Sequence, residues 1–173
     1  MLNKMMSKLG VGENWRFVDV LGLEGDQLSA VPKPCCALML LFPLTQQHDS
    51  FRQHKLTFDG DSALKKFLDE TAKMSADDRA KQLENNKPIR EAHNDVAAQG
   101  QCRPEADKVN FHFIAFVNVN GQLYEFDGRM NGPVNHGDTK DDSFITDAAK
   151  VCRGFMEREQ GEVRFSAVAL CQS

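Results

Sequence analysis

The stretch KVNFHFIAFVNVNGQLYEFDGR, residues Lys108–Arg129, decides how this chain folds, because its pattern is that of a β-hairpin. Apolar and aromatic residues dominate the first arm, Val109–Val119, and the second arm, Gln122–Phe126, follows the pair Asn120-Gly121. Asn-Gly is strongly favoured in two-residue hairpin turns, because both turn positions need a positive φ angle. The sequence therefore predicts two antiparallel strands joined by a tight turn.

A two-residue turn also determines which residues face each other across the hairpin. Val119 is expected to face Gln122, and Ile114 to face Asp127. His112 and Asp127 then become diagonal neighbours on one side, with Cα atoms about 7 to 8 Å apart, so that their side chains can meet. We expect the other side of the first arm to face the core, with Val109, Phe111, Phe113, Ala115, Val117 and Val119.

The predicted pair of His112 and Asp127 has two interpretations. A carboxylate that accepts from one ring nitrogen orients a histidine and stabilises its protonated form, as the general base of a hydrolase requires. A structural hydrogen bond at the end of a hairpin would have the same spacing. The spacing alone leaves both open.

Helices and further strands are predicted on both sides of the hairpin. The fold class we expect is α/β (α+β), with helices packed around a central, mostly antiparallel sheet in a single domain over residues 1–173. A Gly/Pro/Asn/His loop is expected at 129–137. Strands are predicted at 15–20, 35–42 and 162–170, and we expect the strand at 35–42 to be buried on both faces. Helices are predicted at 2–9, at 144–155 and, in several short pieces, between 61 and 100.

Composition excludes several classes of protein. The 173 residues carry 21 basic and 25 acidic side chains, a net charge of −4, without the basic cluster that nucleic-acid binding needs. The longest apolar run, Cys35–Phe42, is too short to span a membrane. The first ten residues lack the apolar core of a signal peptide, and five irregularly spaced cysteines are typical of reduced thiols, so we expect a cytoplasmic protein.

Other histidines and cysteines show no spacing typical of a metal site, so we expect neither a metal nor a cofactor. Cys102, in a polar loop, is the cysteine that we expect to be exposed, whereas small buried side chains are expected at Cys35, Cys36, Cys152 and Cys171. Solvated side chains are expected at His48, His54, His93 and His136.

Four long segments resemble the ubiquitin carboxyl-terminal hydrolases. These are WRFVDVLGLE (15–24), PKPCCALMLLFPLTQQH (32–48), the hairpin itself and GEVRFSAVAL (161–170). The resemblance implies a papain-like thiol protease that cleaves small adducts from the C-terminus of its partner, ubiquitin. It also implies that His112 and Asp127 are the catalytic histidine and aspartate, and that about 85–107 is the crossover loop above the active site.

One segment that the resemblance implies is missing. The family carries its nucleophile in a Gln-x-x-x-x-x-Cys-Gly segment, in which the Gln donates to the oxyanion. That segment should lie between HDSFR (48–52) and FDGDSALKKFL (58–68), where only residues 53–57 stand. We therefore expect an internal deletion near 53–57, a short N-terminal region, and no nucleophilic cysteine beside His112 and Asp127.

Three hypotheses remain open. The first is a hydrolase family member that is inactive as written, through exon skipping or an incomplete gene model. The second is a non-catalytic protein that binds ubiquitin as a decoy or stabiliser. The third is a truncated product that does not fold stably, because the lost segment would leave apolar surface exposed.

Overall fold

The computed structural model describes residues 1–43, 60–99, 111–158 and 164–172. The chain forms two compact units. The first comprises Met1–Trp15 and Leu56–Arg103, and the second comprises Arg16–Lys55 and Pro104–Ser173. The prediction of a single domain over 1–173 stays a prediction.

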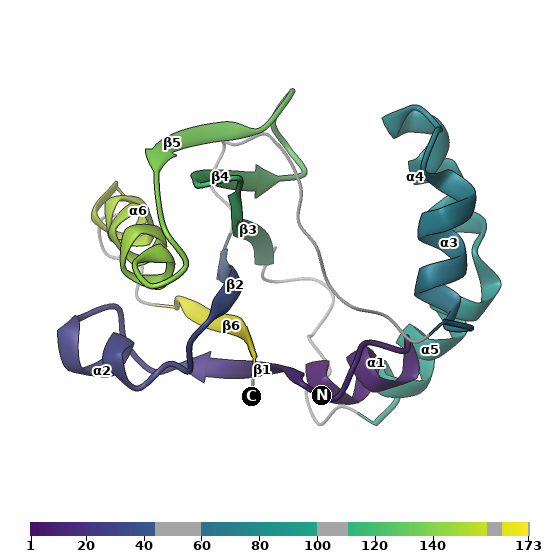
Figure 1. The fold of residues 1–173 in the computed structure, drawn as a ribbon, viewed down its shortest axis with the longest axis horizontal. Helices are drawn as coiled ribbons and strands as arrows, with labels where there is room; N and C mark the ends of the chain where they lie inside the picture. The colour runs from purple at the N-terminus through teal and green to yellow at the C-terminus, as the bar shows by residue number, and fades with distance from the viewer. Residues whose placement is uncertain (44–59, 100–110, 159–163, 173) are drawn as a thin grey trace. The chain divides into compact units, whose positions relative to one another are not determined.

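The second unit contains a six-stranded sheet (Figure 1). Its strands are β1 (Trp15–Val20), β2 (Cys35–Pro43), β3 (Phe111–Val119), β4 (Gln122–Asp127), β5 (Val134–Asp138) and β6 (Ser166–Gln172). They lie in the order β1-β6-β2-β3-β4-β5, and β2 pairs antiparallel with β3 and β6, as β4 does with β3 and β5. The predicted fold class, with helices around a mostly antiparallel sheet, is confirmed.

The hairpin has the predicted turn and register. Asn120 and Gly121 have φ angles of 52° and 81°, the left-handed values that this turn requires. The Asn118 side chain accepts a hydrogen bond from the Gly121 N–H at 2.9 Å, which supports the turn. Ile114 faces Asp127 and Val119 faces Gln122, as expected.

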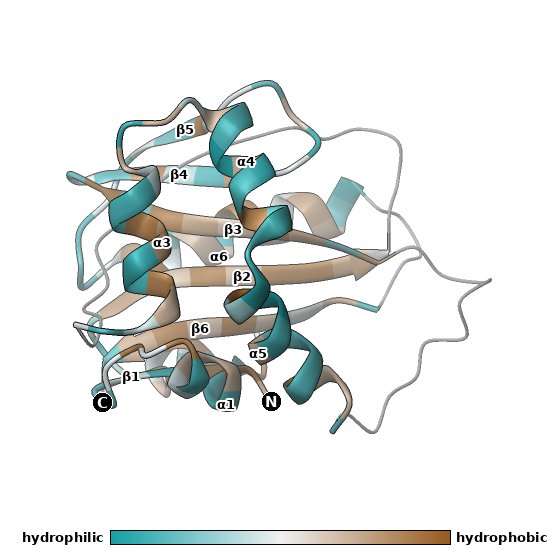
Figure 2. Ribbon diagram, turned by 90° about the vertical axis from the view of Figure 1, so that its right-hand side faces the viewer, coloured by the Kyte–Doolittle hydropathy of each residue, from teal (hydrophilic) through white to brown (hydrophobic). Residues whose placement is uncertain are grey.

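The core of this unit lies between one face of the sheet and the helix α6 (Phe144–Arg158), which packs on β2, β3 and β4 (Figure 1). The short helix α2 (Gly25–Ser29) adds Leu28 to the same cluster. The sheet contributes Leu38, Leu40 and Phe42 from β2, Ile114 and Phe116 from β3, Leu123 from β4, and Ala167, Ala169 and Cys171 from β6. Figure 2 shows β2, β3 and β6 as the most hydrophobic strands.

The predicted core side of β3 is wrong. Ile114 and Phe116, on the same face as His112, are completely buried, whereas Phe113 on the opposite face is 54% exposed. Apolar residues occupy both faces of this strand, so the alternation of the sequence could not choose between them. The position of α6 makes the choice.

Two other predictions need correction. Strand β5 occupies Val134–Asp138, where a loop was expected, because this segment pairs with β4. Strand β2 is fully buried on one face only, since Met39 and Leu41 on its other face are half-buried. The helix α2 was not predicted at all.

Among its described residues, the first unit has four helices: α1 (Leu2–Lys8), α3 (Ala63–Thr71), α4 (Ala76–Asn85) and α5 (Lys87–Ala97). The Ser62, Ser75 and Asn86 side chains cap the last three by accepting backbone N–H bonds. Because Lys87–Ala97 is helical, that part of the predicted crossover loop is wrong, and its residues 100–107 lie outside the described residues.

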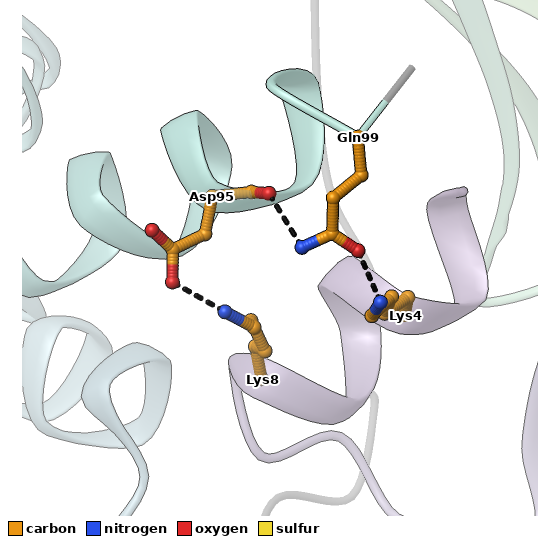
Figure 3. A network of polar contacts seen from close by, with 4 residues as sticks. All are labelled: Lys4, Lys8, Asp95 and Gln99. Atoms are coloured by element: carbon orange, nitrogen blue, oxygen red, sulfur yellow. Dashed lines mark hydrogen bonds and ion pairs between the residues drawn. The ribbon is translucent and has the colours of Figure 1, made fainter. Parts of the chain in front are cut away.

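Polar contacts join α1 to α5 within this unit. The Lys8 ammonium pairs with Asp95, and Lys4 donates to the Gln99 side chain, whose amide in turn donates to the Asp95 carbonyl (Figure 3). Gly10 ends α1 with a φ of 76°, and an added Cβ would lie only 2.0 Å from the Ser62 Cβ. The chain therefore needs glycine here for both conformation and space.

The choice of sheet face can be tested by removing one aromatic ring from each side of β3. Phe116→Ala should lower the free energy of unfolding by about 3–5 kcal/mol, because it leaves a cavity under α6. Phe113→Ala is the matched control on the same strand and should cost less than about 1 kcal/mol, since that ring is exposed. Urea unfolding followed by circular dichroism measures both, and equal losses would contradict the assignment.

Candidate functional site

The His112 side chain on β3 bonds to the Asp127 side chain at the end of β4. The ring Nε2 meets the carboxylate Oδ1, as the register predicts for diagonal neighbours. Asp127 is completely buried, and the His112 side chain is 13% exposed. The structure therefore brings the two predicted site residues together, with the carboxylate inside and the imidazole at the boundary of the core.

The turn after β4 holds the carboxylate in place. The backbone N–H of Arg129 donates to the same Asp127 Oδ1 at 3.0 Å, and the N–H of Met130 donates to the Asp127 carbonyl oxygen at 3.3 Å. Since a carboxylate accepts, Nε2 of the ring donates, and Nδ1 is the basic nitrogen of the neutral histidine. The arrangement can accept a proton at Nδ1 and stabilise the resulting imidazolium through Asp127.

An aromatic side chain supports the other side of the imidazole. Phe42 on β2 lies directly opposite His112 in the sheet, and its ring meets the imidazole edge to face, with centroids 5.7 Å apart. Phe42 also stacks on Phe155 of α6 and on Phe165, just before β6. The histidine is thus oriented by the hairpin, by the neighbouring strand and, through Phe42, by the helix.

A second histidine–carboxylate pair lies on the same face of β4. Glu125 is 2% exposed, and its Oε2 lies 2.6 Å from Nε2 of His136 on β5, whose side chain is 24% exposed. His136 is exposed, as expected, but the contact of its imidazole with the buried Glu125 was not predicted. The sequence did indicate a buried Glu125, because the alternation Leu123-Glu125-Asp127 puts two acids on the face that also carries a core leucine. Of the other histidines, His93 is exposed, and His48 and His54 lie outside the described residues.

The four described cysteines lie at a distance from His112 along their strands or in α6. Cys35 lies at the end of β2 that is opposite to Phe42, where it pairs with Cys171 of β6, and both cysteines are buried. Cys152 is buried in α6. Burial raises the pKa of Cys152 to about 12, with a further contribution from Glu125. Burial and then the nearby Cys171 raise the pKa of the half-buried Cys36 to about 12. Cys102 lies outside the described residues.

The described part of the chain holds neither a cluster of metal ligands nor a membrane-spanning helix. Within 1–43, 60–99, 111–158 and 164–172, no group of three or more His, Cys, Asp or Glu side chains could hold a metal ion. No helix in this part of the chain is long and apolar enough to cross a membrane.

Comparison with known structures defines the class of fold. The catalytic domain of Trichinella spiralis UCH37 bound to ubiquitin vinyl methyl ester matches with a TM-score of 0.74 and 23% identity, over 99% of this chain and 91% of that one. A second structure of Trichinella spiralis UCH37 with the same compound matches with a TM-score of 0.73, over 99% of this chain and 78% of that one. The α/β fold is that of these catalytic domains.

Sequence comparison identifies the family. The profile of ubiquitin carboxyl-terminal hydrolase family 1 matches residues 1–58 and 52–157. The human ubiquitin carboxyl-terminal hydrolase isozyme L1 is 53% identical over 212 residues, covering 100% of this chain and 95% of the relative, and the rat isozyme L1 is 52% identical with the same coverage. This chain belongs to the ubiquitin carboxyl-terminal hydrolase family, a family of thiol-dependent deubiquitinating hydrolases.

The raised pKa of Cys36 predicts slow alkylation. At about pH 8 only ~10⁻⁴ of this thiol is ionised, so iodoacetamide should label it at least about 100-fold more slowly than in the unfolded chain. The rate should rise about tenfold per pH unit up to about pH 10 without a plateau. Peptide mass spectrometry gives the rate, and guanidinium-unfolded protein, with its plateau near the ordinary thiol pKa, is the control. A plateau near neutral pH in the folded chain would contradict the assignment.

Proposed function

We propose that this chain is a ubiquitin carboxyl-terminal hydrolase family member that keeps the catalytic histidine and aspartate, His112 and Asp127, but does not turn over substrate. The observation that carries the proposal is the oriented imidazole of His112, bonded to a buried carboxylate, with none of the described cysteines bonded to it. A general base without a nucleophile has no thiol to deprotonate.

The comparisons support a missing segment near 53–57. The family profile matches in two pieces that meet at 52–58, rather than in one. The alignment to the human isozyme L1 extends over 212 residues, whereas this chain has 173, a difference of 39. A segment of that size can hold the strand-to-helix region in which the family's nucleophile and oxyanion-stabilising glutamine are expected.

The chemistry of the remaining thiols also supports the proposal. An efficient thiol nucleophile has a lowered pKa and an adjacent base. Cys36 and Cys152 have raised pKa values, and Cys152 is completely buried. Cys171 does have a lowered pKa, because the Cys35 thiol hydrogen-bonds to it, but its partner is a second thiol rather than an imidazole.

The proposal predicts no hydrolysis of a fluorogenic ubiquitin substrate, ubiquitin-aminomethylcoumarin. Loss of the nucleophile from a catalytic unit lowers turnover by about 10⁶-fold, to near the uncatalysed rate. His112→Ala is the matched control and should give the same baseline as the unmodified chain. A ubiquitin vinyl sulfone probe should form no adduct. Turnover that His112→Ala abolishes, or covalent labelling of any cysteine, would overturn the proposal.

A second candidate function is ubiquitin binding without catalysis. It is favoured by the retention of the fold, since the matching Trichinella structures hold a ubiquitin derivative and their fold is found over 99% of this chain. Adding unlabelled ubiquitin to the ¹⁵N-labelled chain should then shift a contiguous set of amide resonances, and an unrelated protein of similar charge should not. An unchanged spectrum at high ubiquitin concentration would remove this candidate.

The unstable-product hypothesis has its own readout. A chain that packs α6 on the sheet as described should unfold in urea in one or two cooperative transitions. A spectroscopic signal that decreases gradually with urea concentration, without a cooperative transition, would instead support a product that does not fold stably.

A further inference from the structure

Two cysteines from different strands lie directly opposite each other in the sheet. Cys35, the first residue of β2, pairs with Cys171 near the end of β6, and their exposed fractions are 3% and 0%. Just outside this pair, the backbone N–H of Gln172 donates to the carbonyl oxygen of Pro34 at 3.0 Å. In an antiparallel ladder, that flanking bond identifies the two cysteines as a non-hydrogen-bonded pair, in which the Cα atoms are about 4.5 Å apart.

This separation suits a disulfide. A disulfide needs Cα atoms about 4.4–6.8 Å apart, so the two strands need not separate or slide to accommodate one. On the other side of the pair, the ladder register shifts at Cys36, between Cys35 and Ala37, which is a β-bulge. A bulge locally frees the backbone, so the small adjustment that brings two sulfurs into bonding distance is possible here.

The two thiols already interact in the reduced chain. The Cys35 thiol hydrogen-bonds to the Cys171 sulfur, and this bond lowers the pKa of Cys171 while it raises the pKa of Cys35. The nearby Arg16 lowers the pKa of Cys171 further. Cys171 is therefore the sulfur with the greater thiolate character, and Cys35 is the protonated neighbour beside it.

We propose that Cys35 and Cys171 form a dithiol that hydrogen peroxide oxidises to an intramolecular disulfide between β2 and β6 (Figure 1). This modification site is separate from His112 and Asp127, and it does not depend on ubiquitin binding or turnover.

The chemistry balances with one peroxide molecule. The Cys171 thiolate attacks one peroxide oxygen, the O–O bond breaks, and hydroxide leaves and takes up a proton to become water. The resulting sulfenic acid is attacked by the Cys35 sulfur, which forms the S–S bond and releases a second water. Each sulfur loses one electron and one hydrogen, and both peroxide oxygens are reduced to water. Peroxide is small and uncharged, so local opening of the ladder is enough to admit it.

Mass spectrometry tests the proposal. Treating the full chain with hydrogen peroxide should lower its intact mass by two hydrogen atoms, and dithiothreitol should restore it. After free thiols are blocked, trypsin cleavage at Arg16, Arg52 and Arg164 should yield the peptide 17–52 joined to 165–173. Because 17–52 holds both Cys35 and Cys36, single variants must decide between them.

Three variants make that decision. Cys36→Ala should keep the bridge, whereas Cys35→Ala and Cys171→Ala should lose it, and Cys171 in the Cys35→Ala variant should instead gain oxygen atoms. The oxidised chain should also unfold at a urea concentration about 1–2 M higher, because the bridge closes a loop that includes most of the chain.

Several results would overturn the proposal. They are a bridge that persists in Cys35→Ala, a disulfide-linked dimer, oxygen addition at Cys171 in the unmodified chain without a bridge, or no reaction even in urea just below the unfolding transition. A bridge that leaves the unfolding midpoint unchanged would also contradict it, because β2 and β6 would then not be tied in their native register.

Discussion

The structure of the sheet unit depends on the two-residue turn at Asn120-Gly121. Both residues adopt positive φ angles. Because the turn has only two residues, the register between β3 and β4 cannot shift without changing the turn. A slip of one residue would put Leu123 and Asp127 on the face opposite to that of Ile114 and Phe116, and it would part His112 from Asp127. The turn therefore determines which residues of β3 and β4 share a face, and with that which two side chains meet at the candidate site.

Much of this unit could be predicted from sequence, because local rules govern it. The hairpin, its register and the contact between His112 and Asp127 follow from turn chemistry and the period of a strand. The buried face of β3 could not be predicted in the same way, because Phe111 and Phe113 are as apolar as Ile114 and Phe116. A helix more than twenty residues further along the chain decides it. For the same reason, β5 and the pairing of His136 with Glu125 could not be predicted from the sequence, because both arise from contacts between segments rather than from a local pattern.

The two histidine–carboxylate pairs have one physical cause. Strand β4 places Glu125 and Asp127 on the face that α6 covers, where an unpaired carboxylate would be costly. Each acid meets a histidine from a neighbouring strand, His136 from β5 and His112 from β3. Pairing with a histidine is thus a structural need of this strand, and it holds His112 and Asp127 together independently of the catalytic role proposed for them.

Strand β5 has a further consequence for how the sheet ends. It is five residues long, its last four residues are exposed, its pairing with β4 is interrupted by a register shift, and Gly137 has a φ of 97°. An edge with a bulge, a left-handed glycine and polar side chains presents few aligned N–H and C=O groups to a strand from another molecule. The irregularity of β5 therefore protects this edge of a very apolar sheet against strand-by-strand association between chains.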